Sequence, residues 1–132
     1  MKIRRFLSLP LYIGLAMFGL LQSVLADSAT WQANPGSNNW NTAASWTPAT
    51  IPNGVSDAAT FNVSNTTAIS LTASILVDRI VFQPGASAFT ITPAPGVSLT
   101  LGGAGVANNS GAMQNFVTAG DTSFNSGKIV FT

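Results

Sequence analysis

The side chains of this sequence that could do chemistry are four aspartates and three tryptophans. The aspartates are Asp27, Asp57, Asp78 and Asp121, and none of them lies in a local motif with a second acid. A glycosidase needs two carboxylates about 5–10 Å apart, and the spacing along this chain does not specify such a pair. We therefore interpret the four aspartates as solvated turn or cap residues.

The composition excludes the common nucleophile and metal sites. The chain contains no histidine and no cysteine, so neither a Ser-His-Asp triad nor a zinc site of Cys and His can form. Loops 53–57 and 121–127 offer hard oxygens, but each has one carboxylate, whereas calcium takes about six to eight oxygens with several carboxylates. We expect Asp-anchored turns there, and we predict no catalytic, cofactor-binding or metal-binding residue, no cofactor and no enzyme activity.

Trp31, Trp40 and Trp46 are the sharpest feature of the sequence. Exposed indole rings can stack on sugars, so these residues are candidate glycan contacts, and a carbohydrate-binding or carbohydrate-active module is the alternative function. Large aromatic side chains more often bury about 150–250 Å² each in a core, and a repeat protein needs its first turn covered. The favoured interpretation is a tryptophan-rich N-terminal cap over residues 27–57.

The N-terminus has the three parts of a secretory signal peptide. Residues 1–5 carry three of the five cations of the chain, residues 6–25 are mostly apolar, and Val24-Leu25-Ala26 places modest or small residues before a cut between Ala26 and Asp27. A retained anchor is the alternative, since roughly 20 apolar residues can span a bilayer, but Gln22-Ser23 suits the approach to a cleavage site. We predict export to the extracellular space, cell surface or periplasm, with membrane contact through the signal peptide during export.

The predicted mature segment, residues 27–132, is slightly acidic. It keeps Arg79 and Lys128 against the four aspartates, so its net charge is 2 − 4 = −2. The positive charge of the whole chain therefore comes from the signal peptide, and nucleic acid is not an expected partner. Without cysteine the segment has no disulfides, and stacked repeats are another way to stabilise a small exported domain.

From residue 58 onward, short runs alternate apolar and polar residues, which is typical of half-buried strands. Turn residues separate the runs at 83–85, 93–96, 102–103 and 108–111. The sequence therefore predicts an all-β segment. The expected inward-facing sets are Ala59, Phe61 and Val63; Ile69 and Leu71; Leu76, Ile80 and Phe82; Phe89 and Ile91; Val97, Leu99 and Leu101; and Ile129 and Phe131.

A repeat of 19 residues suggests how these strands are arranged. Its two sets are Phe61, Ile80 and Leu99, and Val63, Phe82 and Leu101. This spacing suits a coil of about 20 residues per turn, in which each turn buries an apolar ladder against its neighbours. We predict β-solenoid repeats over residues 58–132, with an antiparallel β-sandwich as the alternative.

A set of short motifs spread over most of the mature chain carries a family resemblance. The chain resembles the start of bacterial autotransporter-like and surface-sorted proteins with β-strand repeats. That resemblance implies a right-handed parallel β-helix, with the tryptophan-rich part leading into the first turns. The motifs are Trp31, Asn39-Trp40, Trp46, Pro52-Asn53-Gly54, Asp57-Ala58-Ala59-Thr60-Phe61, the strand at 75–82, the glycine-rich run at 99–106 and Asn109-Ser110-Gly111.

The sequence also departs from that family, because it shows no outer-membrane barrel and no C-terminal apolar anchor. It ends at Lys128-Ile129-Val130-Phe131-Thr132, inside an expected strand, and we expect a truncated N-terminal fragment of a longer protein. The predicted function is that of a non-catalytic exported surface or passenger segment, structural or adhesive. Surface glycans or other surface proteins are its expected partners.

Overall fold

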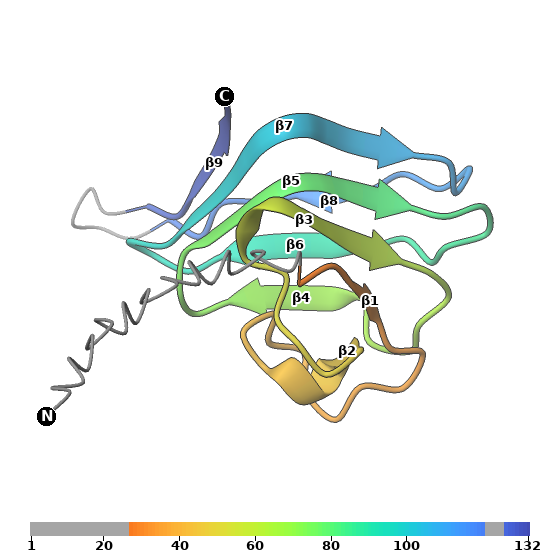
Figure 1. The fold of residues 1–132 in the computed structure, drawn as a ribbon. Coiled ribbons are helices and arrows are strands. Elements are labelled where there is room, and N and C mark those ends of the chain that lie inside the picture. The colour runs from red at the N-terminus through yellow and green to blue at the C-terminus, as the bar shows by residue number, and fades with distance from the viewer. Residues whose placement is uncertain (1–26, 121–125) are drawn as a thin grey trace, which may run out of the picture.

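The computed structural model describes residues 27–120 and 126–132, so the predicted signal peptide and Asp121 lie outside the described residues. Two β-sheets make up the fold (Figure 1). Sheet A has the order β2 (Trp46–Thr47), β1 (Ala29–Trp31), β3 (Gly54–Phe61), β5 (Ile75–Phe82), β7 (Ser98–Asn108) and β9 (Lys128–Phe131). Sheet B has the order β4 (Ala68–Leu71), β6 (Thr90–Pro93) and β8 (Asn115–Phe116), and one 3-10 turn, η1 (Ala43–Ser45), precedes β2.

From β3 onward the chain alternates between the two sheets, placing each new strand beside the one laid down two strands earlier. All these pairings are parallel, and the one antiparallel pair in the described residues joins β1 to β2. Parallel neighbours need a crossover connection, and here each crossover includes a strand of the other sheet. The all-β prediction is confirmed, and the antiparallel sandwich is wrong for these ladders.

The predicted repeat of 19 residues is wrong. Phe61 lies opposite Phe82, a step of 21 positions, and Leu99 lies opposite Ile129, a step of 30. The steps differ because turns and bulges add different numbers of residues to each passage. Val63, which the 19-residue repeat paired with Phe82, lies beyond the end of β3 and is 65% exposed.

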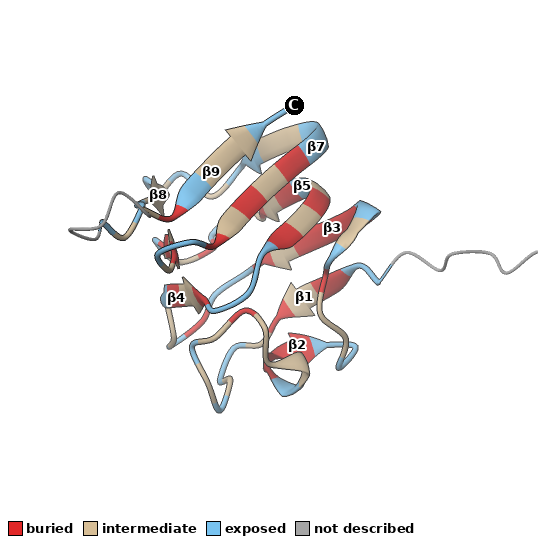
Figure 2. Ribbon diagram, turned by 90° about the vertical axis from the view of Figure 1, so that its left-hand side faces the viewer, coloured by how far each residue is buried: buried red, intermediate tan, exposed pale blue. Residues whose placement is uncertain are grey.

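Figure 2 shows buried bands that alternate along the strands of sheet A. In β5 this alternation changes phase within the strand. Ile75 and Val77 are buried, and so are Ile80 and Phe82, whereas Leu76 is half-buried. The predicted inward position of Leu76 is therefore wrong. A register shift after Val77 moves the apolar positions from odd to even numbers, and a bulge of this kind has that effect on alternation.

Two of the four predicted turns have a clear sequence cause. Ala86 N donates to the Gln83 carbonyl and Val97 N donates to the Ala94 carbonyl, each across a Pro-Gly pair. Gly85 and Gly96 adopt φ values of 77° and 75°, as the third residue of a type II turn requires. The turn expected at residues 102–103 is wrong, because both glycines lie inside β7.

The remaining inward sets agree with the structure except at the last strand. Ile69, Leu71, Phe89, Ile91, Val97, Leu99 and Leu101 are all buried, and they share one core with the three tryptophans. In β9, Ile129 is half-buried and Phe131 is 64% exposed. Strand β3 runs across the boundary predicted between residues 57 and 58, so the tryptophan-rich region and the strands after it belong to one packed unit.

Candidate functional site: a polar bulge row across sheet A

Two strands of sheet A, β3 and β7, carry extra residues at the same level, one on each side of β5. Gly54 and Ala58 of β3 pair with Val77 and Arg79 of β5, so residues 55–57 stand opposite Asp78 alone. On the other side, Leu101 and Gly105 of β7 pair with the same two residues of β5, so residues 102–104 also stand opposite Asp78. We call residues 55–57, Asp78 and residues 102–104 the bulge row.

Most of the charged residues that the structure describes lie at or beside this row. The described residues contain five charged side chains, those of Asp27, Asp57, Asp78, Arg79 and Lys128. Asp57 and Asp78 belong to the bulge row, Arg79 follows it in β5, and Asp27 is hydrogen-bonded to Asp57. Because β-bulges interrupt regular ladder pairing, this is where sheet A needs side chains to complete its hydrogen bonding.

Asp57 is a buried carboxylate, with 3% of its surface exposed. Its Oδ1 accepts a hydrogen bond from Asp27 N at 2.8 Å, and its Oδ2 accepts one from Asn53 N at 3.0 Å. The second bond is the Asp-anchored turn that we expected at residues 53–57. Asp57 therefore connects Asp27, which lies just before β1, to the bulge of β3.

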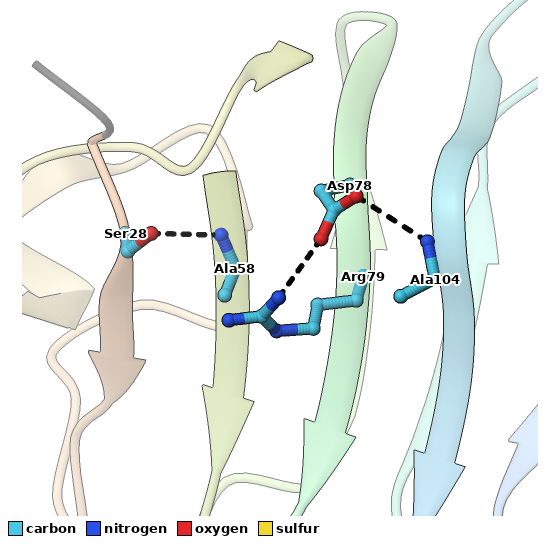
Figure 3. A network of polar contacts seen from close by, with 5 residues as sticks. All are labelled: Ser28, Ala58, Asp78, Arg79 and Ala104. Carbon is cyan, nitrogen blue, oxygen red and sulfur yellow. Dashed lines mark hydrogen bonds and ion pairs between the residues drawn. The ribbon is translucent and has the colours of Figure 1, made fainter. Parts of the chain in front are cut away.

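Polar contacts at the bulge row join two pairs of neighbouring strands, β1 with β3 and β5 with β7 (Figure 3). Ala58 N of β3 donates to Ser28 Oγ, just before β1, at 2.9 Å, and Ala104 N of β7 donates to Asp78 Oδ1 at 3.3 Å. Arg79 Nη1 pairs with Asp78 Oδ2 at 3.0 Å, with both side chains partly exposed. Such a surface ion pair contributes about 0–1 kcal/mol, so the backbone bonds do more to fix the strands.

Gly103 is the residue that makes room for Asp78. A Cβ atom at position 103 would overlap Asp78 Oδ1, which means that only glycine lets the carboxylate reach Ala104 N without rearrangement. Two signals in the sequence indicate the row: the Gly102-Gly103 pair and the change of apolar phase at Asp78. Together they distinguish a bulged strand from the turn that we expected there.

The chemistry available to the bulge row is hydrogen bonding by carboxylates that already have donors. Among the residues that the structure describes, no pocket is found and no three acidic, histidine or cysteine side chains gather as a metal group would. Asp121 and residues 122–125 of the predicted 121–127 loop lie outside the described ranges. What the geometry of the row provides is a set of contacts that hold strand register.

The three tryptophans form a buried cluster rather than a platform. Each is at most 1% exposed, and Trp46 contacts both others edge-on, with ring centroids 5.0 and 4.9 Å away. Trp46 Nε1 donates to the Trp40 carbonyl at 2.8 Å, and Trp40 Nε1 donates to the Pro52 carbonyl at 3.2 Å. In this arrangement none of the indoles predicted as glycan contacts presents a face to a sugar.

No family model, curated protein or solved structure matches this chain. In the described part of the chain, no helix has the length and apolar character needed to cross a membrane.

Proposed function

We propose that this protein is an exported, non-catalytic surface or passenger segment with a structural or adhesive role. Its signal peptide directs it out of the cytoplasm and is removed after Ala26. Residues 27–132 then fold as the first turns of a right-handed parallel β-helix, as in the autotransporter-like and surface-sorted proteins that the sequence resembles. Its partners are other surface proteins or surface glycans, which bind at positions other than the buried tryptophan cluster.

The alternation of parallel strands between sheets A and B is the observation that carries this proposal. Each passage through β3, β4 and β5, and again through β5, β6 and β7, adds one strand to each sheet in the same direction. Successive turns of a β-helix are related in this way. Parallel crossovers within one sheet are right-handed in about 98% of cases, which favours the right-handed form.

The packing at the N-terminal end supports a cap on the coil. Trp31 and Phe61 lie 6.3 Å apart, and Phe61 stacks on Phe82 with centroids 5.2 Å apart and planes 25° from parallel. The indoles therefore extend the column of buried aromatic rings to which Phe61 and Phe82 belong. At the edge of sheet A, the two-residue strand β2 pairs antiparallel with β1, and so short an edge discourages pairing with other chains.

Export is tested by expressing the full chain in a Gram-negative host and fractionating the cells. We expect the protein in the periplasm, at the surface or in the medium, with an intact mass that corresponds to residues 27–132. An Arg4→Glu/Arg5→Glu variant should remain in the cytoplasm at full length, because the basic head of the signal peptide is lost. Cytoplasmic full-length protein from the unmodified sequence would contradict the proposal.

The structural or adhesive role is tested by measuring the binding of the exported protein to surface polysaccharide and to surface proteins. We expect any binding to surface polysaccharide or surface protein to respond to substitutions at exposed positions such as Val55 or Met113. A folded Trp46→Phe variant should bind as the unmodified protein does, because the ring at position 46 is buried. Loss of sugar binding in that folded variant would instead favour the carbohydrate-binding module.

A further inference from the structure

We propose that Asp57 is a receptor for the new N-terminus of the processed chain, so that removal of the signal peptide locks the first strand onto sheet A. This inference rests on the proposed export and on cleavage after Ala26. It adds a role for that cleavage beyond releasing the protein: the cut creates the cation that the buried carboxylate of Asp57 lacks. The ligand of the site is an α-ammonium group.

The geometry places the future terminus on the carboxylate. Asp27 N lies 2.8 Å from Asp57 Oδ1, and Ser28 Oγ accepts from Ala58 N at 2.9 Å. Residues 27 and 28, which directly precede β1 at Ala29, are therefore hydrogen-bonded to two successive residues of β3, Asp57 and Ala58. The atom that becomes the α-amino nitrogen is already within hydrogen-bonding distance of Asp57.

The surroundings of Asp57 suit a cation. The carboxylate is buried, and a buried charge costs free energy unless it is paired. Among the described residues the one ion pair joins Arg79 to Asp78, so Asp57 has backbone donors but no basic side chain. Gly54 leaves space for the carboxylate, since a Cβ there would lie 2.9 Å from Asp57 Oδ2.

The covalent step is hydrolysis by the signal peptidase of the export machinery. One water molecule is consumed as the bond between Ala26 and Asp27 breaks. Its oxygen adds to the Ala26 carbonyl carbon, which becomes a carboxylate, and its two hydrogens pass to the Asp27 nitrogen, which becomes an ammonium. An amide hydrogen bond to the Asp57 carboxylate is thereby replaced by an ion pair, in which the donor carries a charge as well as the acceptor.

The test compares three exported proteins with one another: the unmodified chain, Asp57→Asn, and a chain with Gly-Ser inserted between Ala26 and Asp27. The insertion keeps the residues before the cut but moves the ammonium two residues away, leaving an amide at Asp27. Each purified protein is weighed by intact mass and then treated near pH 7 with limiting acetic anhydride. Lys128, the one lysine of residues 27–132, serves as the internal reference.

We expect the α-amine of the unmodified protein to be acetylated about tenfold more slowly, relative to Lys128, than that of either variant, because pairing holds it protonated and each pKa unit changes the free amine tenfold. The melting temperature of the insertion variant should fall by about 4 °C or more. Asp78→Asn, which removes the partly exposed carboxylate of the same row, should leave the α-amine rate unchanged.

Intact mass separates the two proposals. A cut after Ala26 with equal α-amine rates in the unmodified and insertion proteins would overturn the receptor role of Asp57 and leave export standing. A cut elsewhere in an exported protein would overturn the receptor role alone, and full-length protein that stays in the cytoplasm would overturn both. If Asp57→Asn fails to fold, the insertion variant alone decides the outcome.

Discussion

At the residue scale, the tryptophans carry both packing and hydrogen bonds. Trp31 Nε1 donates to the Thr66 carbonyl at 3.1 Å, so this indole ties β1 to the segment before β4, as Trp40 and Trp46 tie the segment around η1 together. Among the described residues no buried side-chain polar atom lacks a partner. Because a buried carbonyl left without its donor costs free energy, loss of an indole removes apolar area and a hydrogen bond together.

We predict that Trp46→Ala lowers the free energy of unfolding by about 3–5 kcal/mol, because it leaves a cavity between Trp31 and Trp40 and removes the donor to the Trp40 carbonyl. Denaturant unfolding followed by circular dichroism measures the change. Val63→Ala, at an exposed apolar position, is the matched control and should stay within about 0.5 kcal/mol. Similar small changes in both variants would refute the buried cluster.

A second prediction concerns the bulge row. Gly103→Ala should cost about 1–3 kcal/mol, because the new methyl group overlaps Asp78 Oδ1. In an Asp78→Ala background the same substitution should cost far less, since the overlapping atom is gone, and this coupling is what a double-mutant cycle measures. Gly36→Ala, which meets nothing within 4 Å, controls for the loss of a glycine. Equal costs in both backgrounds would rule out the contact.

At the element scale, the local sequence pattern predicts which residues form strands better than it predicts the register between the strands. The alternation of apolar residues is enough to find Ile69 and Leu71 in β4 and Leu99 and Leu101 in β7. Register depends on how many residues each turn and bulge absorbs, and the sequence leaves that number open. The side-chain period of two then makes an error of one residue invert the predicted face, as happened at Leu76.

The bulge row is predictable from the sequence only in part, because it depends on the register between strands. The turn anchored by Asp57 depends on a short-range interaction across four residues, so it is predictable from the sequence. The meeting of Asp57, Asp78 and Gly103 at one level of sheet A depends on the register of three strands. The burial of the three indoles was the favoured interpretation because large aromatics usually enter a core, and the structure agrees.

Two phenylalanines of sheet A test the assignment of faces at this scale. Phe82 is fully buried between Phe61 and Phe89, whereas Phe131 of β9 is mostly exposed. We predict that Phe82→Ala costs about 3–5 kcal/mol and that Phe131→Ala costs less than about 0.5 kcal/mol. Thermal unfolding of the two variants measures the difference, and a cost at Phe131 equal to that at Phe82 would contradict the orientation of β9.

At the scale of the whole molecule, the two ends of the strand stack differ. The β1 and β2 end holds the tryptophan cluster and a short antiparallel edge, while β9 forms the opposite edge of sheet A, as Figure 1 shows. Between them each strand contacts the strands one passage before and after it. Stability in such a stack comes mainly from neighbouring passages, and the bulge row and the aromatic column are the features that these passages share.

Paired cysteines test the central claim, which is that the chain alternates between two parallel sheets in the observed register. The protein has no cysteine of its own. Thr60 lies opposite Val81 in sheet A, and Ser70 lies opposite Thr92 in sheet B. Directly opposite residues on neighbouring strands are about 5 Å apart, which is within disulfide range, whereas diagonal neighbours are about 7–8 Å apart.

Mild oxidation followed by mass spectrometry should therefore give a disulfide in Thr60→Cys/Val81→Cys and in Ser70→Cys/Thr92→Cys. Asn62→Cys/Val81→Cys, the pair that a 19-residue repeat would place opposite each other, should remain reduced. Disulfide formation in that control pair, with none in the two predicted pairs, would contradict the register and the alternation of parallel strands on which the proposed β-helix depends.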